Sequence, residues 1–271
     1  MQALYDFIAG TLNTVAWIYI LLPCVFVGGL YYTIGSGGVQ FRRFGYAMKN
    51  TFGKIFKKTD AGEGEVTPLQ AVCTALAGTV GTGNIVGTSQ AIALGGYGAI
   101  FWLWLAALLG MVIKYAEVTL SIRYREKDTK GDWVGGPMYY IKNGLGQKWA
   151  WLAILFCTFA VLASFGIGNM SQANSINDSI KGAIAAFAPD FANVAAVDWV
   201  IGIALALLTA GVLFGGIKRI GSVTERLVPI MSIVYIIFTL VVIFGNIDMV
   251  GEAFRKIFIA AFNPQAVVGA G

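Results

Sequence analysis

Hydrophobic residues form long uninterrupted runs along this chain, and short polar connections separate them. Five of the runs are roughly 20 residues long, which is the length that a helix needs to cross a bilayer core of about 30 Å. They cover residues 15–34, 99–122, 149–170, 198–217 and 227–245. The pattern therefore predicts five ordinary membrane-spanning helices.

A sixth stretch, 68–94, is long enough to span a membrane but is interrupted near its middle. Its interruption contains four glycines and three polar side chains, namely Gly78, Gly81, Gly83, Gly87, Thr79, Thr82 and Asn84. Each glycine costs a helix about 1 kcal/mol relative to alanine. Non-helical backbone survives at bilayer depth only within protein or beside a cavity, because hydrocarbon offers no hydrogen bonds. We predict two half-helices with an extended middle, and we interpret the middle as a binding site.

The beginning of this interrupted stretch carries a local helix signal. Thr67 is a favourable N-cap residue, Pro68 suits the first helical position, and Gln70 completes a Thr-x-x-Gln capping box. The first half-helix is therefore expected to begin directly after Thr67.

Composition excludes an ordinary soluble domain. The chain is 57% hydrophobic and 12% charged, whereas soluble domains carry about 25% charged residues. The net charge of +5 does not indicate a nucleic-acid partner, because the basic residues lie in the connections between apolar runs. The sequence has no histidine, which excludes an imidazole metal ligand or a histidine base.

The basic connections also predict an orientation. Most of the 19 Lys and Arg residues lie in 35–67, 123–148 and 218–226, and such connections stay on the cytoplasmic side. This places the N-terminus outside a multi-pass protein of the cell membrane, with the interrupted stretch running from inside to outside. Residues 176–197 are then expected to form an outer loop, and 251–262 a short amphipathic segment on the outer side.

The glycine-rich middle permits three functional interpretations. A dinucleotide-binding loop requires a preceding strand, which a membrane span does not provide. The segment Thr79–Gly83 resembles a potassium-channel filter, but a filter needs a pore helix and four copies around an axis. The third is a discontinuous transport helix, whose half-helix ends offer N–H groups to an anion and carbonyls to a cation. We favour the transport helix and keep an ion channel as the alternative.

Simple close packing of glycines against a neighbouring helix is the structural alternative, and it leaves the clustered threonines and asparagine unexplained. A second polar cluster follows the run 149–170 and consists of Asn169, Ser171, Gln172, Asn174 and Ser175. Most of these are expected to form a polar helix end. Gln172 could instead turn towards the interrupted helix, where an amide can donate to a carboxylate and accept from an ammonium.

Charged residues within or beside the spans are interpreted more plainly. Lys114 and Glu117 are three residues apart and are expected to pair with each other. Glu225 and Arg226 lie at an expected membrane interface, and we interpret them as topology signals.

Four segments together resemble the alanine/glycine:cation symporter family, the bacterial and archaeal sodium:alanine symporters. They are Gly37-Gly38-Val39-Gln40-Phe41, residues 74–90, residues 135–140 and residues 168–175. The resemblance implies an all-α membrane protein with a leucine-transporter-like inverted-repeat fold. Span 15–34 would be an extra N-terminal helix, and 68–94 would be the first broken helix among six membrane segments.

The resemblance also implies roles for individual residues. The substrate-binding set would be Gly78, Gly81, Thr82, Gly83, Asn84 and Gln172, with backbone amides around Gly81–Gly83 holding a carboxylate. The sodium-binding set would be Ala77, Thr79, Val80 and Asn84. Carbonyls of Ala77 and Val80 would serve one cation site, and the side chains of Thr79 and Asn84 would serve another.

The activity that follows from the resemblance is transport without covalent chemistry. The protein would not be an enzyme and would carry a small neutral amino acid, alanine or glycine, into the cell with sodium by alternating access. Sodium would be the coupling ion and the sole metal, with no other cofactor. The expected partners are the amino acid, Na⁺ and the bilayer, and the oligomeric state is left open. The family has about as many residues again, so we expect 1–271 to form the first repeat with the second repeat absent.

Overall fold

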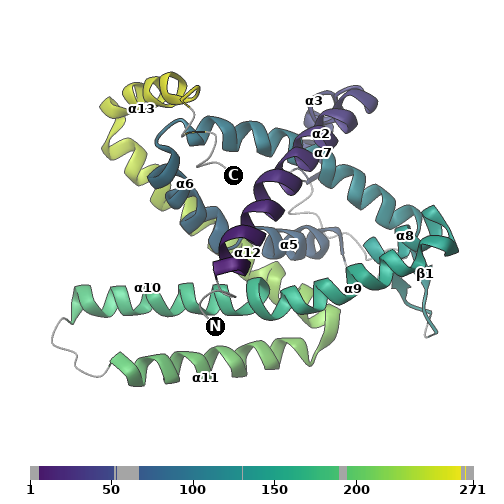
Figure 1. The fold of residues 1–271 in the computed structure, drawn as a ribbon. Helices are drawn as coiled ribbons and strands as arrows, with labels where there is room; N and C mark the ends of the chain where they lie inside the picture. The colour runs from purple at the N-terminus through teal and green to yellow at the C-terminus, as the bar shows by residue number, and fades with distance from the viewer. Residues whose placement is uncertain are drawn as a thin grey trace. The chain divides into compact units, whose positions relative to one another are not determined.

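The computed structural model describes residues 6–51, 53, 67–129, 131–188, 194–263 and 266. It is almost entirely helical (Figure 1), as expected for an all-α membrane protein. Five helices are long and apolar enough to cross a membrane, and a bent pair makes up to six. They are Gly10–Gly35, Ala99–Arg123, Gln147–Phe187, Ala196–Leu213, Arg219–Gly245 and the pair Leu69–Thr79 plus Gly83–Gly95.

Within the described residues, the elements follow one another as helices with one small hairpin. In the first part of the chain they are η1 (Phe7–Leu12), η2 (Val15–Leu21), α2 (Leu22–Gly35), α3 (Val39–Arg42), α4 (Phe44–Thr51), α5 (Pro68–Thr79), η4 (Gly83–Gly87), α6 (Thr88–Gly95) and α7 (Ala99–Arg123). There follow β1 (Glu126–Lys127), β2 (Trp133–Val134), α8 (Pro137–Leu145), η5 (Gln147–Trp149), α9 (Ala150–Phe165), η6 (Gly166–Met170), α10 (Ser171–Phe187), α11 (Val194–Leu213), α12 (Gly216–Gly245) and α13 (Ile247–Ala260).

The chain forms two compact units. The first comprises Met1–Lys57, Ile85–Ile122 and Ile237–Gly271, and the second comprises Lys58–Asn84 and Arg123–Ile236. Each unit is described separately below.

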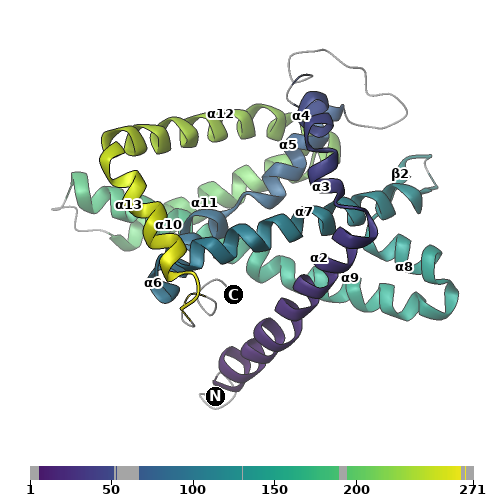
Figure 2. The same cartoon turned by 90° about the horizontal axis from the view of Figure 1, so that it is seen from above.

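In the first unit, two contacts hold other helices to α7. Gly29 of α2 lies so close to Leu109 that a Cβ at Gly29 would come 2.7 Å from the Leu109 Cβ. At the other end of α7, the Trp102 indole Nε1 donates to the Ala261 carbonyl at 2.6 Å. Helix α13, which turns back from the end of α12 (Figure 2), ends beside this contact. Small residues and one indole therefore set the packing around α7.

In the second unit, α8 packs against α9, and α10 lies alongside α11 (Figure 1). The hairpin of β1 and β2 was not predicted from the sequence. Gly131 at φ +88° forms its turn, the Asp132 N–H donates to the Asp128 side chain at 2.9 Å, and the Arg125 guanidinium lies 3.9 Å from the centre of the Trp133 ring. This cation–π contact and the turn chemistry stabilise so short a strand pair.

The prediction of an outer loop at residues 176–197 is wrong in large part, because helix α10 continues to Phe187 and α11 begins at Val194. Two polar side chains of this segment bond from α10 to α11. The Lys181 ammonium lies 2.9 Å from the Asp198 carboxylate, and the Asn177 amide donates to the same carboxylate at 2.7 Å. Their partners on α11 allow these side chains to sit on a helix.

The connection expected at 218–226 is also helical. Helix α12 already begins at Gly216, and the chain turns at Phe214 and Gly215 instead. Long basic side chains at the end of a span can extend to the headgroups, so they do not require the helix to stop. Two other polar residues of this segment, Thr224 and Glu225, bond to α5 as described below.

Candidate functional site

The interrupted span breaks at two residues, Val80 and Gly81, which we call the break. Helix α5 ends at Thr79, and Val80 adopts an extended conformation with φ −86° and ψ 99°. The chain is helical again from Thr82, and the helical pieces on either side are bent by 53°. The sequence predicted a longer extended middle, but the glycines at 83 and 87 are accommodated in the π-helical segment η4.

The backbone groups at the break bond locally and to a side chain. The Val80 N–H donates to the Leu76 carbonyl at 2.7 Å, whereas the Gly81 N–H donates to Asn84 Oδ1 at 3.0 Å. In a continuous helix the Gly81 N–H would bond to the Ala77 carbonyl. At the break, the Gly81 N–H therefore bonds to Asn84 instead of to the Ala77 carbonyl. Asn84 is the third residue of the second half-helix, and its side chain caps the start of that helix.

The hydroxyl of Thr79 is bonded within α5. It donates to the Ala75 carbonyl at 2.7 Å, an i to i−4 bond typical of threonine in helices. A hydroxyl oxygen keeps its lone pairs when it donates, so Thr79 can still offer an oxygen to a cation. Ala77 and Gly78 lie on the same last turn of α5, and both are exposed.

The structure places the amide of Gln172 beside the break. A Cβ at position 81 would lie in contact with Gln172 Nε2, at 3.4 Å, so a side chain larger than that of alanine would meet the amide. Gln172 is the second residue of α10, which continues from α9 through the π-helical segment η6. Glycine at position 81 therefore permits a close approach between the break and α10.

Two other members of the polar cluster after residue 168 bond along their own helix. The Asn174 amide donates to the Asp178 carboxylate at 3.0 Å, and the Ser175 hydroxyl donates to the Ser171 carbonyl at 3.1 Å. Within this cluster, Gln172 is the member that the structure brings to Gly81.

Close packing does not account for the remaining glycines. Around Gly78, Gly83 and Gly87, an added Cβ would meet no described side chain or neighbouring helix within 4 Å. Thr82 is half-buried, whereas Gly83 and Asn84 are exposed. Ligand binding by these residues and by Ala77, Thr79 and Val80 stays a prediction.

The described ranges contain no group of three His, Cys, Asp or Glu residues that could hold a metal ion. A cation at the break would therefore need oxygen ligands from carbonyls, hydroxyls and the Asn84 amide. Such oxygens are the ligands that unwound transport helices offer to Na⁺.

Two polar contacts between α5 and α12 were missed by the sequence reasoning. Gln70 Nε2 donates to Glu225 Oε2 at 2.9 Å, and the hydroxyls of Thr74 and Thr224 lie 3.1 Å apart. The available signal was the i, i+4 spacing of Gln70 and Thr74, which puts both on one face of α5. Their partners, Thr224 and Glu225, were expected in a connection rather than in a helix, so no helix was predicted to face this side of α5.

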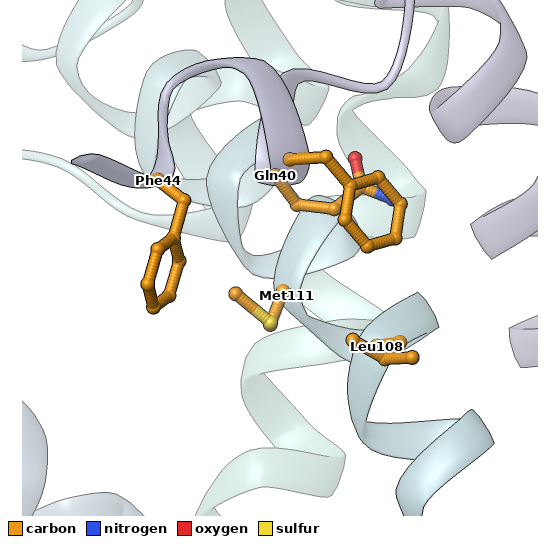
Figure 3. A pocket seen from close by; sticks show the side chains of 5 residues that line it. Gln40, Phe44, Leu108 and Met111 are labelled. Atoms are coloured by element: carbon orange, nitrogen blue, oxygen red, sulfur yellow. The ribbon is translucent and has the colours of Figure 1, made fainter. Parts of the chain in front are cut away.

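The charge pair predicted inside α7 is present. Lys114 Nζ lies 2.9 Å from Glu117 Oε1, and both side chains remain partly exposed. A separate apolar crevice of about 340 Å³ in the first unit is lined by Gln40, Phe41, Phe44, Leu108 and Met111 (Figure 3). None of the predicted site residues lines this crevice.

Comparison with known proteins identifies the family. The family model described as "Sodium:alanine symporter family" matches residues 1–271. An uncharacterized transporter of Haemophilus influenzae is 43% identical over 97% of this chain and 54% of its own length. The sodium/alanine symporter AgcS of Methanococcus maripaludis is 40% identical over 98% of this chain and 57% of its own length.

The amino-acid carrier protein AlsT of Bacillus subtilis is 36% identical over 100% of this chain and 54% of its own length. The chain thus spans about half the length of the relatives that it matches. The channel interpretation of the Thr79–Gly83 segment finds no support in these comparisons. The chain belongs to the sodium:alanine symporter family, a family of transporters and not of enzymes.

Proposed function

We propose that the full-length protein couples the entry of sodium to the uptake of a small neutral amino acid, alanine or glycine, by alternating access. The observation that carries this proposal is the break at Val80 and Gly81, where helical hydrogen bonding stops beside the amide of Gln172. A break of this kind presents backbone polar groups inside a span, where they can replace the hydration shell of an ion and of a charged substrate.

The substrate carboxylate would bind at the start of the second half-helix. The N–H groups of Thr82 and Gly83 open this helix, and its positive dipole end favours an anion. The Gly81 N–H is bonded to Asn84 Oδ1, so a carboxylate that used it would have to displace the asparagine side chain. Gln172, beside Gly81, would contact the amino acid and leave room for a small side chain.

Sodium would bind on the other side of the break. The Ala77 and Val80 carbonyls and the Thr79 hydroxyl lie at the end of α5, whose negative dipole end favours a cation. Asn84 would contribute to either ligand, because it caps the backbone that both use. Two ligands that order the same backbone raise each other's affinity by the same factor, which would couple sodium to substrate.

The fold proposed for the full-length protein is the leucine-transporter-like inverted repeat. Span Gly10–Gly35 would be the extra N-terminal helix, and α5 with α6 the first broken helix. The N-terminus would lie outside the cell membrane, so that α5 begins at the cytoplasmic side.

Uptake of labelled alanine into proteoliposomes containing the full-length protein tests the proposal. We expect saturable uptake that requires an inward sodium gradient and is absent when potassium replaces sodium. Sodium-independent uptake, or ion flux without amino-acid movement, would contradict it. Unlabelled glycine and glutamine as competitors would establish the size of side chain that the site accepts.

A further inference from the structure

We propose that Glu225 of α12 is a positioning residue that holds α5 through Gln70 and thereby sets the place of the break. This inference rests on the proposed transport function. The contacts concerned lie within the second unit, and we call them the clasp: Thr67, Gln70, Thr74, Thr224 and Glu225.

Gln70 uses both ends of its amide. Its Oε1 accepts from the Thr67 N–H at 3.1 Å, which completes the capping box, and its Nε2 donates to Glu225 Oε2 at 2.9 Å. A capping box needs only the oxygen of the glutamine. The remaining donor therefore ties the first turn of α5 to a carboxylate that lies 155 residues further along the chain.

One turn further along α5, a second contact repeats the connection. The Thr74 and Thr224 hydroxyls are 3.1 Å apart, and the Thr224 hydroxyl lies 2.9 Å from the Ile220 carbonyl. Thr224 has one hydroxyl hydrogen, so when it donates to Ile220 the hydrogen between the two threonines comes from Thr74. Two contacts one turn apart fix the rotation of α5 as well as its distance from α12.

Two buried residues lie next to the clasp. Cys73, next to Thr74, is 3% exposed, and Val228, one turn after Thr224, is also 3% exposed. The clasp residues themselves are half-buried, so these neighbours limit the access of water to its hydrogen bonds.

Glu225 lies within the candidate span Arg219–Gly245. Among the described residues it belongs to no ion pair, and its hydrogen bond comes from a neutral amide. An ionisable residue inside a span is a functional candidate.

The distance from the clasp to the break explains why the orientation of α5 matters for the ligands. Gln70 and Val80 are ten residues apart, which is about 15 Å along a helix. A tilt of α5 by about 4° at the clasp would therefore move the break by about 1 Å, enough to disturb a cation site built from carbonyls. Glu225 acts on the ligands through α5 and does not touch them.

The test uses the full-length protein in a background where Cys73 is the sole cysteine. The rate of Cys73 labelling by N-ethylmaleimide and the sodium dependence of alanine uptake are measured side by side. Glu225→Ala and Gln70→Ala should each raise the labelling rate roughly tenfold or more and weaken the apparent sodium affinity. Glu225→Gln keeps an acceptor oxygen and should stay close to the parent protein in both measurements.

Arg226→Ala is the matched control, because Arg226 is exposed and adjacent, and it should change neither measurement. Unchanged Cys73 labelling in Glu225→Ala would overturn the inference, as would a Glu225→Gln variant as impaired as Glu225→Ala. Should Glu225→Ala fail to fold, the nearly isosteric Thr224→Val removes the second contact and should raise labelling to a smaller extent. Labelling does not depend on transport, so an absence of sodium-driven uptake in every variant would count against the proposed function alone.

Discussion

The two ends of α5 are built in opposite ways. At its start, Thr67 and Gln70 exchange two hydrogen bonds, and Gln70 reaches Glu225 on another helix. At its end, the Gly81 N–H donates to the side chain of Asn84, three residues away. One end is fixed by contacts across the fold, whereas the hydrogen bonds described at the other end are local, and a ligand can replace the one from Gly81 to Asn84. Helix α5 thus has a fixed end at Thr67 and Gln70 and an adaptable end, its tip, at the break.

Filling the space at the adaptable end should have the largest effect. Gly81→Val would push a branched side chain into the Gln172 amide, which already lies 3.4 Å from the position of a Cβ. We expect alanine uptake to fall by about 100-fold, because displacement by about 1 Å can cost that much. Gly87→Ala is the matched control, since nothing lies within 4 Å of its Cβ position, and it should retain uptake. Equal activity of both variants would rule out a site at the break.

Removing the local bond at the tip should have the next largest effect. Asn84→Ala leaves the Gly81 N–H without its partner and removes an oxygen proposed for sodium. We expect the apparent affinities for sodium and alanine each to weaken roughly tenfold, equivalent to about 1.4 kcal/mol. Asn84→Asp keeps the acceptor oxygen and should preserve sodium dependence. The measurement is uptake as a function of sodium concentration. Normal behaviour of Asn84→Ala would show that Asn84 is not part of the site.

A smaller effect is expected at the side chain that faces the tip from α10. Gln172→Ala should weaken alanine affinity about three- to tenfold, the cost of one or two hydrogen bonds, with less change in sodium dependence. Asn174→Ala, whose amide bonds to Asp178 on the exposed face, serves as the control. Isothermal titration of alanine at saturating sodium would separate the two, and an equal loss in both variants would argue against a specific role for Gln172.

The smallest effect should come from the fixed end. Thr67→Ala removes the N-cap oxygen that accepts from the Gln70 N–H at 3.2 Å. The expected cost is about 1 kcal/mol of stability, or a melting temperature lower by about 2–4 °C. Thr67→Ser retains the oxygen and should melt like the parent protein. A larger loss in Thr67→Ala would mean that the bond from Gln70 to Glu225 also depends on this N-cap.

The sequence predicted features that depend on local chemistry. Hydropathy located the spans because a bilayer demands long apolar helices, and Thr67, Pro68 and Gln70 predicted the start of α5 because a capping box involves only four consecutive residues. The glycine cluster located the break for the same reason. Its length was overestimated, because glycine lowers helix stability only moderately and Asn84 restores the cap at the second half-helix.

Features that depend on distant partners could not be predicted. The loop predicted at 176–197 did not take account of Asp198 on α11, which is a common acceptor for Lys181 and Asn177. Glu225 was interpreted as a topology signal because its donor, Gln70, is 155 residues earlier in the chain. From the sequence, Gln172 could belong to a polar helix end or turn towards the interrupted helix. Only the packing of α10 beside Gly81 decides between these alternatives.

The hydrogen bond between Trp102 and the Ala261 carbonyl has a consequence for biogenesis. Its two residues are 159 positions apart, and at about 5–20 residues per second a ribosome needs roughly 10–30 s to cover that interval. During that delay the indole of Trp102 has no such acceptor, and headgroups or water must serve in its place. Docking of α13 onto α7 is therefore a late event, and a nascent chain arrested before residue 261 should leave this tryptophan in a wetter, more red-shifted fluorescent environment than the completed one.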